Sequence, residues 1–344
     1  MPARRSESRY RRKITLKRIA INRRGHPNNH PPELSASESP VASNARFRFA
    51  GHQTFVFRYG WLEKGVRGAH ECPTLFSEDD ALVRLGVGKN MVSSIRYWCE
   101  VTQLIKPDRN KANDRSRMKV AEIGERLLLD NGWDSFLEDD ASLWLVHWLL
   151  ISNPSVVTPW QLVFSRFHRP DFTRRELIAF ISSFAERQGL TASSTVITRD
   201  VDCLIRCYAS SEGELPSFGE GFNCPFLQLD LLQPSPDGDL YRFAIGPKPS
   251  LPPAIFAFAL TEYLNRVAGT TNTLSIQKCL YGEGSPGQVF KLDENSLVSY
   301  VEELEGQTER ALILDETAGL KQIYRRKPVD PFAMLDDYYR GRRR

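Results

Sequence analysis

The residues best placed to do chemistry in this chain begin with a histidine in the segment Gly51-His52-Gln53-Thr54. His52 could act as a general acid or base, because the imidazole of histidine titrates near neutral pH. Thr54 and Arg58 lie close by in the sequence and could grip a phosphate group through a hydroxyl and a guanidinium. The alternative is a buried, hydrogen-bonded histidine in an aromatic wall, and the composition of the segment favours that alternative.

Carboxylates at three places supply the other candidate groups. Carboxylates that converge near a scissile phosphate can hold Mg²⁺ or Mn²⁺ and orient a water molecule for hydrolysis. At each place a helix is also expected to begin, and helix capping explains acidic side chains there. The sequence leaves open whether any of them converge. The three places are Glu138-Asp139-Asp140, Asp200 with Asp202, and Asp293-Glu294. The catalytic candidates are therefore His52, Glu138, Asp139, Asp200 and Asp202.

Several familiar sites are missing from the sequence. Gly86-Val87-Gly88-Lys89 lacks the four-residue gap of a Walker loop and follows a predicted helix, so neither a nucleotide nor a flavin is expected. No pair of histidines is interpreted as a metal site. Cys203 and Cys207 share one helix face, but no second pair completes a zinc site, and two buried thiols are expected.

A helix-turn-helix is predicted between Phe76 and Ile105. Ser77 is an N-cap residue followed by three acidic residues, which predicts a short helix through Leu85. A glycine-containing turn follows, and apolar residues at three- and four-residue spacing predict a second helix from Lys89. In this motif the second helix lies in the major groove of DNA. Its outward residues are expected to be Lys89, Asn90, Ser93, Ser94, Arg96 and Tyr97.

The basic stretch from Lys106 to Lys119 is interpreted as the wing of a winged helix. Basic side chains on such a wing contact phosphates, whereas side chains of the second helix contact base edges as well. A module that binds proteins or is purely structural is the alternative interpretation. The predicted DNA contacts are Thr54, Arg58, Lys89, Asn90, Ser93, Arg96, Arg115 and Arg117.

The same plan is predicted twice more along the chain, without sequence similarity between the copies. In the second copy, Thr173 and Glu176 fit a capping box, another helix passes through Tyr208, and Pro236-Asp237-Gly238 turns a hairpin. The third copy is expected to have a helix over Asp293–Leu304 and a hairpin with strands Ala311–Leu314 and Leu320–Tyr324.

The most apolar segment, Phe136–Phe167, separates the first two copies and is expected to form the core. Its tryptophans are surrounded by leucines, a pattern typical of a core and not of a base-stacking platform. The predicted fold class is mainly α with small β-hairpins (α+β), built from winged-helix-like units around this helical core. The expected division is a disordered basic arm over 1–45, a winged-helix-like domain over 46–130, a central helical and winged-helix-like domain over 131–265, a winged-helix-like unit over 266–325 and a basic tail over 326–344.

Charge is unevenly spread along the chain, which has a net charge of +4. Residues 1–30 hold ten basic side chains and one acid, which leaves the remainder of the chain at −5. Basic ends of this kind attract polyanions with little sequence preference, and a solvated tail is the alternative. Because no apolar run is long enough for a membrane span or a signal peptide, a cytoplasmic protein without a membrane partner is expected.

Four separated motifs resemble the family of domain-of-unknown-function 4007 (DUF4007) proteins. They occur in the order that the family shows, and the resemblance covers about residues 46–325. The motifs are Phe49–Phe55 with Arg58–Gly65, Leu85–Val92 with Ile95–Trp98, Leu137–Asp139 with Leu143–Trp148, and Gly284–Phe290.

The resemblance implies a role in bacterial DNA phosphorothioation and phage defence. The best-described type of member works beside a cysteine desulfurase and an ATP-dependent sulfurtransferase, and nicks one strand of double-stranded DNA to allow sulfur insertion. A metal-activated water, with Mg²⁺ or Mn²⁺, is the chemistry expected for such a cut. Two alternatives stay open, which are a non-catalytic DNA-binding adaptor that recruits the sulfurtransferase and a transcriptional regulator.

Overall fold

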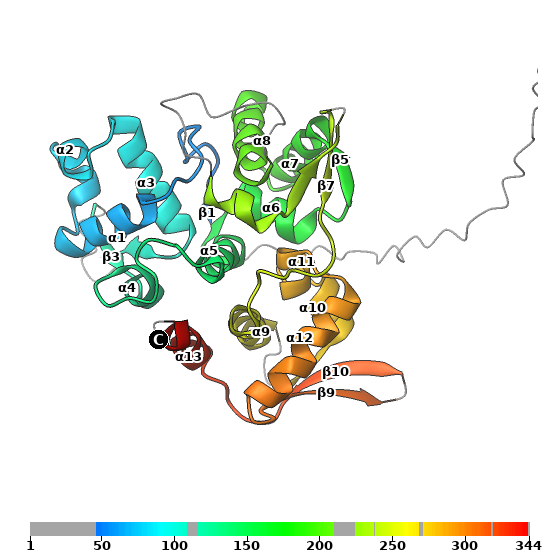
Figure 1. Cartoon of the computed structure of the whole chain (residues 1–344). Helices are drawn as coiled ribbons and strands as arrows, with labels where there is room; N and C mark the ends of the chain where they lie inside the picture. The colour runs from blue at the N-terminus through cyan, green and yellow to red at the C-terminus, as the bar shows by residue number, and fades with distance from the viewer. Residues whose placement is uncertain are drawn as a thin grey trace, which may run out of the picture. The chain divides into compact units, whose positions relative to one another are not determined.

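The computed structural model describes residues 46–108, 116–209, 224–236, 238–267, 271–317 and 319–342. They belong to one compact unit, Asn44–Arg344. Helices dominate and the sheets are small, so the predicted α+β class is confirmed (Figure 1). The basic arm over 1–45 and the predicted DNA contact Arg115 lie outside the described residues.

The first region contains the predicted helix pair and strands on either side of residues 109–115. Gly86 adopts a left-handed φ of 65° and ends the first helix of the pair, and the second helix begins at Lys89 as expected. The first helix starts after Asp80, whereas Ser77 ends a short 3₁₀ turn, so the predicted cap at Ser77 was wrong. The elements are α1 (Trp61–Glu71), η1 (Leu75–Ser77), α2 (Ala81–Leu85), α3 (Lys89–Val101), β2 (Ile105–Pro107) and β3 (Met118–Val120).

The core lies in the middle of the chain, as its composition predicted. Helix α5 (Asp140–Ser152) is buried on every side, and Trp144 and Trp148 are fully buried. Asp139 caps α5 with its side chain, which confirms the capping interpretation for that residue. The neighbouring elements are β1 (Arg46–Phe47), α4 (Glu122–Leu128), β4 (Val156–Val157), which pairs parallel with β1, and α6 (Pro159–Arg166).

Two later regions share one order of elements: a helix, a strand, two or more helices and a hairpin. In both, the second strand of the hairpin pairs with the first strand of the region, so the sheet orders β5-β7-β6 and β8-β10-β9 correspond. The capping box at Thr173 and the cap at Asp293 are confirmed, as are both hairpins. The elements are α6, β5 (Asp171–Thr173), α7 (Arg174–Arg187), α8 (Ser194–Tyr208), η2 (Pro225–Leu229), β6 (Leu232–Pro234) and β7 (Leu240–Phe243), then α9 (Pro253–Val267), β8 (Thr273–Ser275), α10 (Ile276–Tyr281), α11 (Pro286–Phe290), α12 (Glu294–Gln307), β9 (Leu312–Thr317) and β10 (Leu320–Arg325).

The first region follows a reduced version of this plan. Instead of a third strand, a single hydrogen bond joins Met118 N–H of β3 to the carbonyl of Pro73 (2.7 Å). The interpretation of the three regions as winged-helix-like units, and the domain boundaries drawn from it, stay predictions.

Part of the predicted basic tail forms a packed helix, α13 (Pro331–Arg342), which lies against α9. Leu335 and Tyr339 are buried, and the ring of Tyr339 stacks on Trp133 at a centroid distance of 5.2 Å. No helix in the described part of the chain is both long and apolar enough to cross a membrane.

Candidate nucleic-acid interface

The loop that precedes α1 has an unusual backbone between residues 50 and 54. Ala50, Gln53 and Thr54 all adopt left-handed φ angles, of 56°, 51° and 67°. Such angles are uncommon outside glycine and cost about 1–3 kcal/mol each, most of all for a β-branched residue. Gly51 has a different constraint, since a Cβ there would lie 2.3 Å from the ring of Tyr97. The surrounding contacts must therefore hold this loop in its shape.

The side chain of His52 is the centre of those contacts. It is fully buried, and its Nε2 lies 2.5 Å from Oδ1 of Asp200 on α8. The backbone N–H of Thr54 donates to Nδ1 (3.0 Å), which places the ring proton on Nε2. The Asp200 carboxylate also accepts from the backbone N–H of Ala50 (2.9 and 3.1 Å). Both ring nitrogens of His52 are thus occupied, and the bond to Asp200 ties the loop to α8.

The same loop is bonded to α3 on its other side. Ser94 of α3 donates its hydroxyl to the carbonyl of His52 (2.9 Å). The carbonyl of Phe55 accepts from Trp98 of α3 (3.3 Å) and from the thiol of Cys203 of α8 (3.4 Å). The loop therefore joins α3 and α8, between which it lies in Figure 1.

The exposed residues of α3 lie in its first turns. Lys89, Asn90 and Ser93 are exposed, as predicted for the outward face. The N-cap is Gly88, which provides no side-chain cap, so the first backbone N–H groups of α3 remain available to an anion. Ser94 and Tyr97 were also expected to point outward, but both are buried because the loop of His52 covers that side of the helix.

The other predicted DNA contacts differ in exposure and in the side-chain contacts that they already make. Thr54 is exposed, and the guanidinium of Arg58 lies over the rings of Phe55 and Trp61 at 5.7 and 5.3 Å from their centroids. Arg96 is half-buried and pairs with Glu100 (3.1 Å), a carboxylate that Arg48 also contacts. Arg117 is half-buried, and its buried Nε has no hydrogen-bond partner among the described residues.

An arginine that the sequence did not single out completes the arrangement. Arg206 on α8 is exposed, and its Nη2 donates to the carbonyl of Thr54 (2.7 Å). The periodicity that predicted the buried side of α8 also left Arg206 and Arg199 on the opposite side, and that signal could have found them.

Of the five catalytic candidates, the structure brings together only His52 and Asp200. Asp202 pairs through both oxygens with Arg174 (2.5 and 2.9 Å), and Glu138 is exposed. Asp139 caps α5 and accepts from the hydroxyl of Tyr338 (3.1 and 3.2 Å). Asp200 lies inside α8 and not at its start, where Ser193 is the cap, so the expected helix start at Asp200 and Asp202 was wrong.

The described residues do not assemble a metal site. No group of three or more His, Cys, Asp or Glu side chains among them has the geometry to hold a metal ion. Cys203 and Cys207 are fully buried, which agrees with the prediction of core thiols. Burial raises the pKa of the Cys203 thiol well above its usual value, so this side chain is a poor metal ligand.

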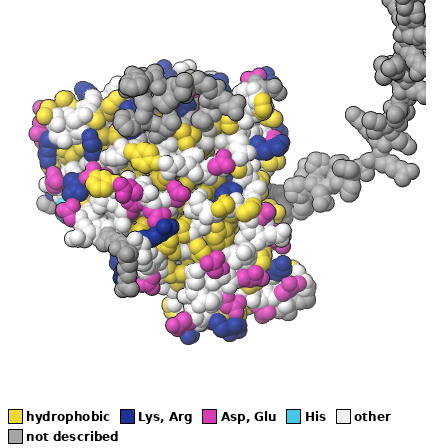
Figure 2. All heavy atoms as spheres, in the orientation of Figure 1, with side chains coloured by type: hydrophobic (Ala, Val, Ile, Leu, Met, Phe, Trp, Pro, Cys, Tyr) yellow, Lys and Arg dark blue, Asp and Glu magenta, His cyan; other side chains and the backbone are white. Residues whose placement is uncertain are grey.

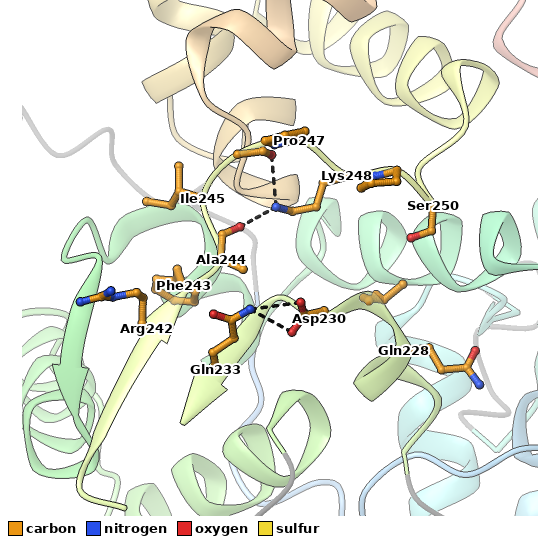
Figure 3. Close-up of a pocket in the computed structure, with 13 residues that line it drawn as sticks. Gln228, Asp230, Gln233, Arg242, Phe243, Ala244, Ile245, Pro247, Lys248 and Ser250 are labelled. Atoms are coloured by element: carbon orange, nitrogen blue, oxygen red, sulfur yellow. Dashed lines mark hydrogen bonds between the residues drawn. The ribbon is translucent and has the colours of Figure 1, made fainter. Parts of the chain in front are cut away.

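A separate cavity of about 430 Å³ lies between β6, β7 and the segment that leads to α9 (Figure 3). The charged groups that line it already have hydrogen-bond partners, two of them among the other lining residues. Lys248 donates to the carbonyls of Ala244 and Gly246, Asp230 accepts from Gln233 (3.1 Å), and Arg242 pairs with Asp171 (2.5 Å). The face drawn in Figure 2 likewise mixes basic and acidic side chains, so neither feature marks a ligand of one charge.

The comparison that decides the family is a match over most of the chain. The family described as "Protein of unknown function (DUF4007)" matches residues 49–339. The chain belongs to the DUF4007 family. The match reaches into α13, beyond the end at residue 325 that the motifs indicated.

Two solved structures resemble this DUF4007 protein over nearly its whole length. A crystal structure of SspB is 29% identical, with a TM-score of 0.76, and the match covers 86% of this chain and 89% of SspB. A magnesium ion-bound crystal structure of SspB is also 29% identical, with a TM-score of 0.78 and coverage of 88% and 90%. No curated protein matches the chain.

Proposed function

We propose that this DUF4007 protein binds double-stranded DNA as a component of a bacterial DNA phosphorothioation system in the cytoplasm. Its similarity to SspB covers 86–88% of this chain and 89–90% of SspB. The resemblance of its motifs to the DUF4007 family, to which the chain belongs, implies a role in that system. Its partners would be the cysteine desulfurase and the ATP-dependent sulfurtransferase of the system.

One observation supports DNA binding most directly, which is the exposed start of α3. Lys89, Asn90 and Ser93 offer an ammonium, an amide and a hydroxyl on one surface of the second helix of a helix-turn-helix. These groups contact phosphates and base edges, and such a helix presents its N-terminal residues to the major groove. Thr54 is exposed in the adjoining loop, which Ser94 fixes to α3.

The proposal is tested with a double variant, Lys89→Ala with Asn90→Ala. We expect the Kd for a duplex to rise about tenfold, since a base contact and a phosphate contact are both lost. Fluorescence anisotropy with a labelled duplex measures this change. The matched control is Gln277→Ala with Lys278→Ala, an exposed amide and lysine on α10. Equal affinities of the two double variants for the duplex would show that the start of α3 does not contact DNA.

Strand nicking is a second candidate function, favoured by the magnesium ion bound to the similar SspB. His52, Glu138, Asp139, Asp200 and Asp202 remain its candidate residues, although the described residues form no metal cluster. Supercoiled plasmid is incubated with the pure protein and Mg²⁺ or Mn²⁺, in parallel reactions with and without EDTA. Open circles that form only in the reactions without EDTA would support nicking. Intact plasmid under every condition would favour the adaptor or the regulator, since both bind DNA without cutting it.

A further inference from the structure

We propose that α8 is a second DNA-contacting helix, and that it binds the same duplex as α3. This inference rests on the proposed function, because it extends the DNA-binding surface from the first region into the second. The residues that carry it are Thr195, Arg199 and Arg206, together with the loop that joins the two helices.

The position of α8 in its region corresponds to that of α3. Each is the last α-helix before the hairpin of its region, β2–β3 for α3 and β6–β7 for α8, although the 3₁₀ helix η2 lies between α8 and β6. In helix-turn-helix proteins the second helix of the pair enters the major groove. Helix α8 follows α7 in a packed helix pair, so it is the second helix of its own pair.

The exposed side of α8 has the chemistry of a phosphate-binding surface. Ile197, Val201 and Leu204 are buried, while Thr195, Arg199 and Arg206 are exposed on the opposite side. Asp202, which lies on the same side of α8, is paired through both oxygens with Arg174. Among the described residues, neither Arg199 nor Arg206 forms an ion pair with a carboxylate. Guanidinium and hydroxyl groups without exposed large apolar residues suit a nucleic-acid backbone better than an apolar protein surface.

Arg206 is also held in place before any ligand binds. Its Nη2 donates to the carbonyl of Thr54 (2.7 Å) and its Nε to the carbonyl of Asp202 (3.4 Å). Two hydrogen bonds to carbonyls fix the guanidinium without neutralising its charge, and its other N–H groups make no hydrogen bond within the described part of the chain. Less side-chain entropy is then lost when a phosphate binds.

The loop of His52 makes α3 and α8 one rigid surface. Within a few residues it is bonded to Ser94 and Trp98 of α3 and to Asp200 and Cys203 of α8. Because these contacts are buried or half-buried, the two helices cannot move independently without breaking them. A duplex bound to α3 would therefore meet Arg206 at a fixed position beside Thr54, with Arg199 seven residues earlier on the same side of α8.

The experiment uses the full chain. It compares an α8 double variant, which carries both Arg199→Ala and Arg206→Ala, with the wild type and with a control double variant. The control, Lys278→Ala with Lys321→Ala, removes the same number of charges from α10 and β10. We expect the α8 variant to raise the Kd for a duplex about tenfold and to lower the magnitude of the salt slope by about 0.9 per lost phosphate contact. The control should change the Kd less than threefold, on the order of one weak non-specific contact.

Two further measurements keep the outcome clear. Urea unfolding curves verify that the variants are folded. The variant Arg206→Lys keeps the positive charge and should therefore bind the duplex more tightly than Arg206→Ala does. An α8 variant that binds as tightly as the control, while the α3 variant is weakened, would overturn the inference and leave the proposed function standing. Absence of duplex binding by the wild-type chain would instead overturn the proposed function.

Discussion

Asp200 stabilises the loop of His52 through buried hydrogen bonds. Its carboxylate accepts hydrogen bonds from the His52 ring and from the backbone N–H of Ala50. The rings of Tyr97 and Trp160 pack against the His52 ring. Removing the carboxylate would leave two buried donors without partners, each of which costs about 1–3 kcal/mol. It would also release the strained backbone between residues 50 and 54.

We therefore expect Asp200→Ala to lower the free energy of unfolding by about 2–5 kcal/mol. The matched control lies two residues further along α8. Asp202→Ala breaks an exposed ion pair with Arg174 and should change the free energy of unfolding by less than about 1 kcal/mol. Urea unfolding followed by tryptophan fluorescence compares the two. Similar losses in both variants would contradict the structural role of the buried pair.

Lys291 is a buried cation that no carboxylate neutralises in the described part of the chain. Its ammonium lies 5.3 and 4.1 Å from the ring centroids of Phe164 and Phe243 and donates to the carbonyl of Phe164 (3.4 Å). Burial lowers the pKa of this lysine to about 7. In the unfolded chain the same group keeps its ordinary pKa of 10.5.

Stability should therefore rise with pH above neutrality. Between about pH 7 and pH 10 the unfolded chain binds more protons at Lys291 than the folded chain does, so the free energy of unfolding increases by up to about 1.4 kcal/mol per pH unit. Below pH 7 the lysine is protonated in both states and this slope vanishes. Urea unfolding at pH 7.5, 8.5 and 9.5 should show a flatter dependence for Lys291→Met. Parallel slopes for wild type and variant would refute the lowered pKa.

Sequence patterns could identify His52 as a special residue but not its partner. Nothing local connects positions 52 and 200, which meet only because the loop crosses from α3 to α8. The same crossing explains why Ser94 and Tyr97 were placed on the wrong side of α3. Helical periodicity shows which residues share a side, but it does not show how many sides another segment will cover.

At the scale of elements, local signals predicted most of what formed. The start of α3 at Lys89, the capping box of α7 and both later hairpins follow from caps, turns and periodicity within a few residues. One error arose where two residues close together could both cap a helix: Ser77 was predicted as the N-cap, but α2 begins after Asp80. Helix α13 was missed as an element because the sequence analysis weighed the arginines at its C-terminal end and not Leu335 and Tyr339, which carry its packing.

Helix α13 is expected to contribute strongly to stability. It contacts α9, stacks Tyr339 on Trp133 and places Asp336 against Arg126 (2.9 Å) and Trp133 (2.8 Å). A chain that ends at Lys327 would expose the apolar surface that Leu335 and Tyr339 cover, at a cost of about 3–6 kcal/mol. Thermal unfolding should show a clearly lower Tm for this chain than for one that ends at Arg342. Equal Tm values would mean that the helix packs too weakly to matter.

The whole molecule combines a repeated plan with an uneven charge. The sheet orders of the second and third regions correspond, and α3 and α8 occupy corresponding positions, which no sequence similarity between the copies had indicated. We propose that these regions are winged-helix-like units and that two of them meet DNA together. We also propose that the arm over residues 1–30, whose charge is +9, adds phosphate contacts without sequence preference.

The most direct measurement is therefore a salt titration of duplex binding with the full chain and with a chain that lacks residues 1–30. We predict that the shortened chain still binds the duplex, with a smaller salt slope because phosphate contacts are lost. Its remaining affinity should fall further with Lys89→Ala and Asn90→Ala. Loss of all duplex binding on removal of the arm would contradict the claim that α3, α8 and the loop of His52 form the DNA-binding surface.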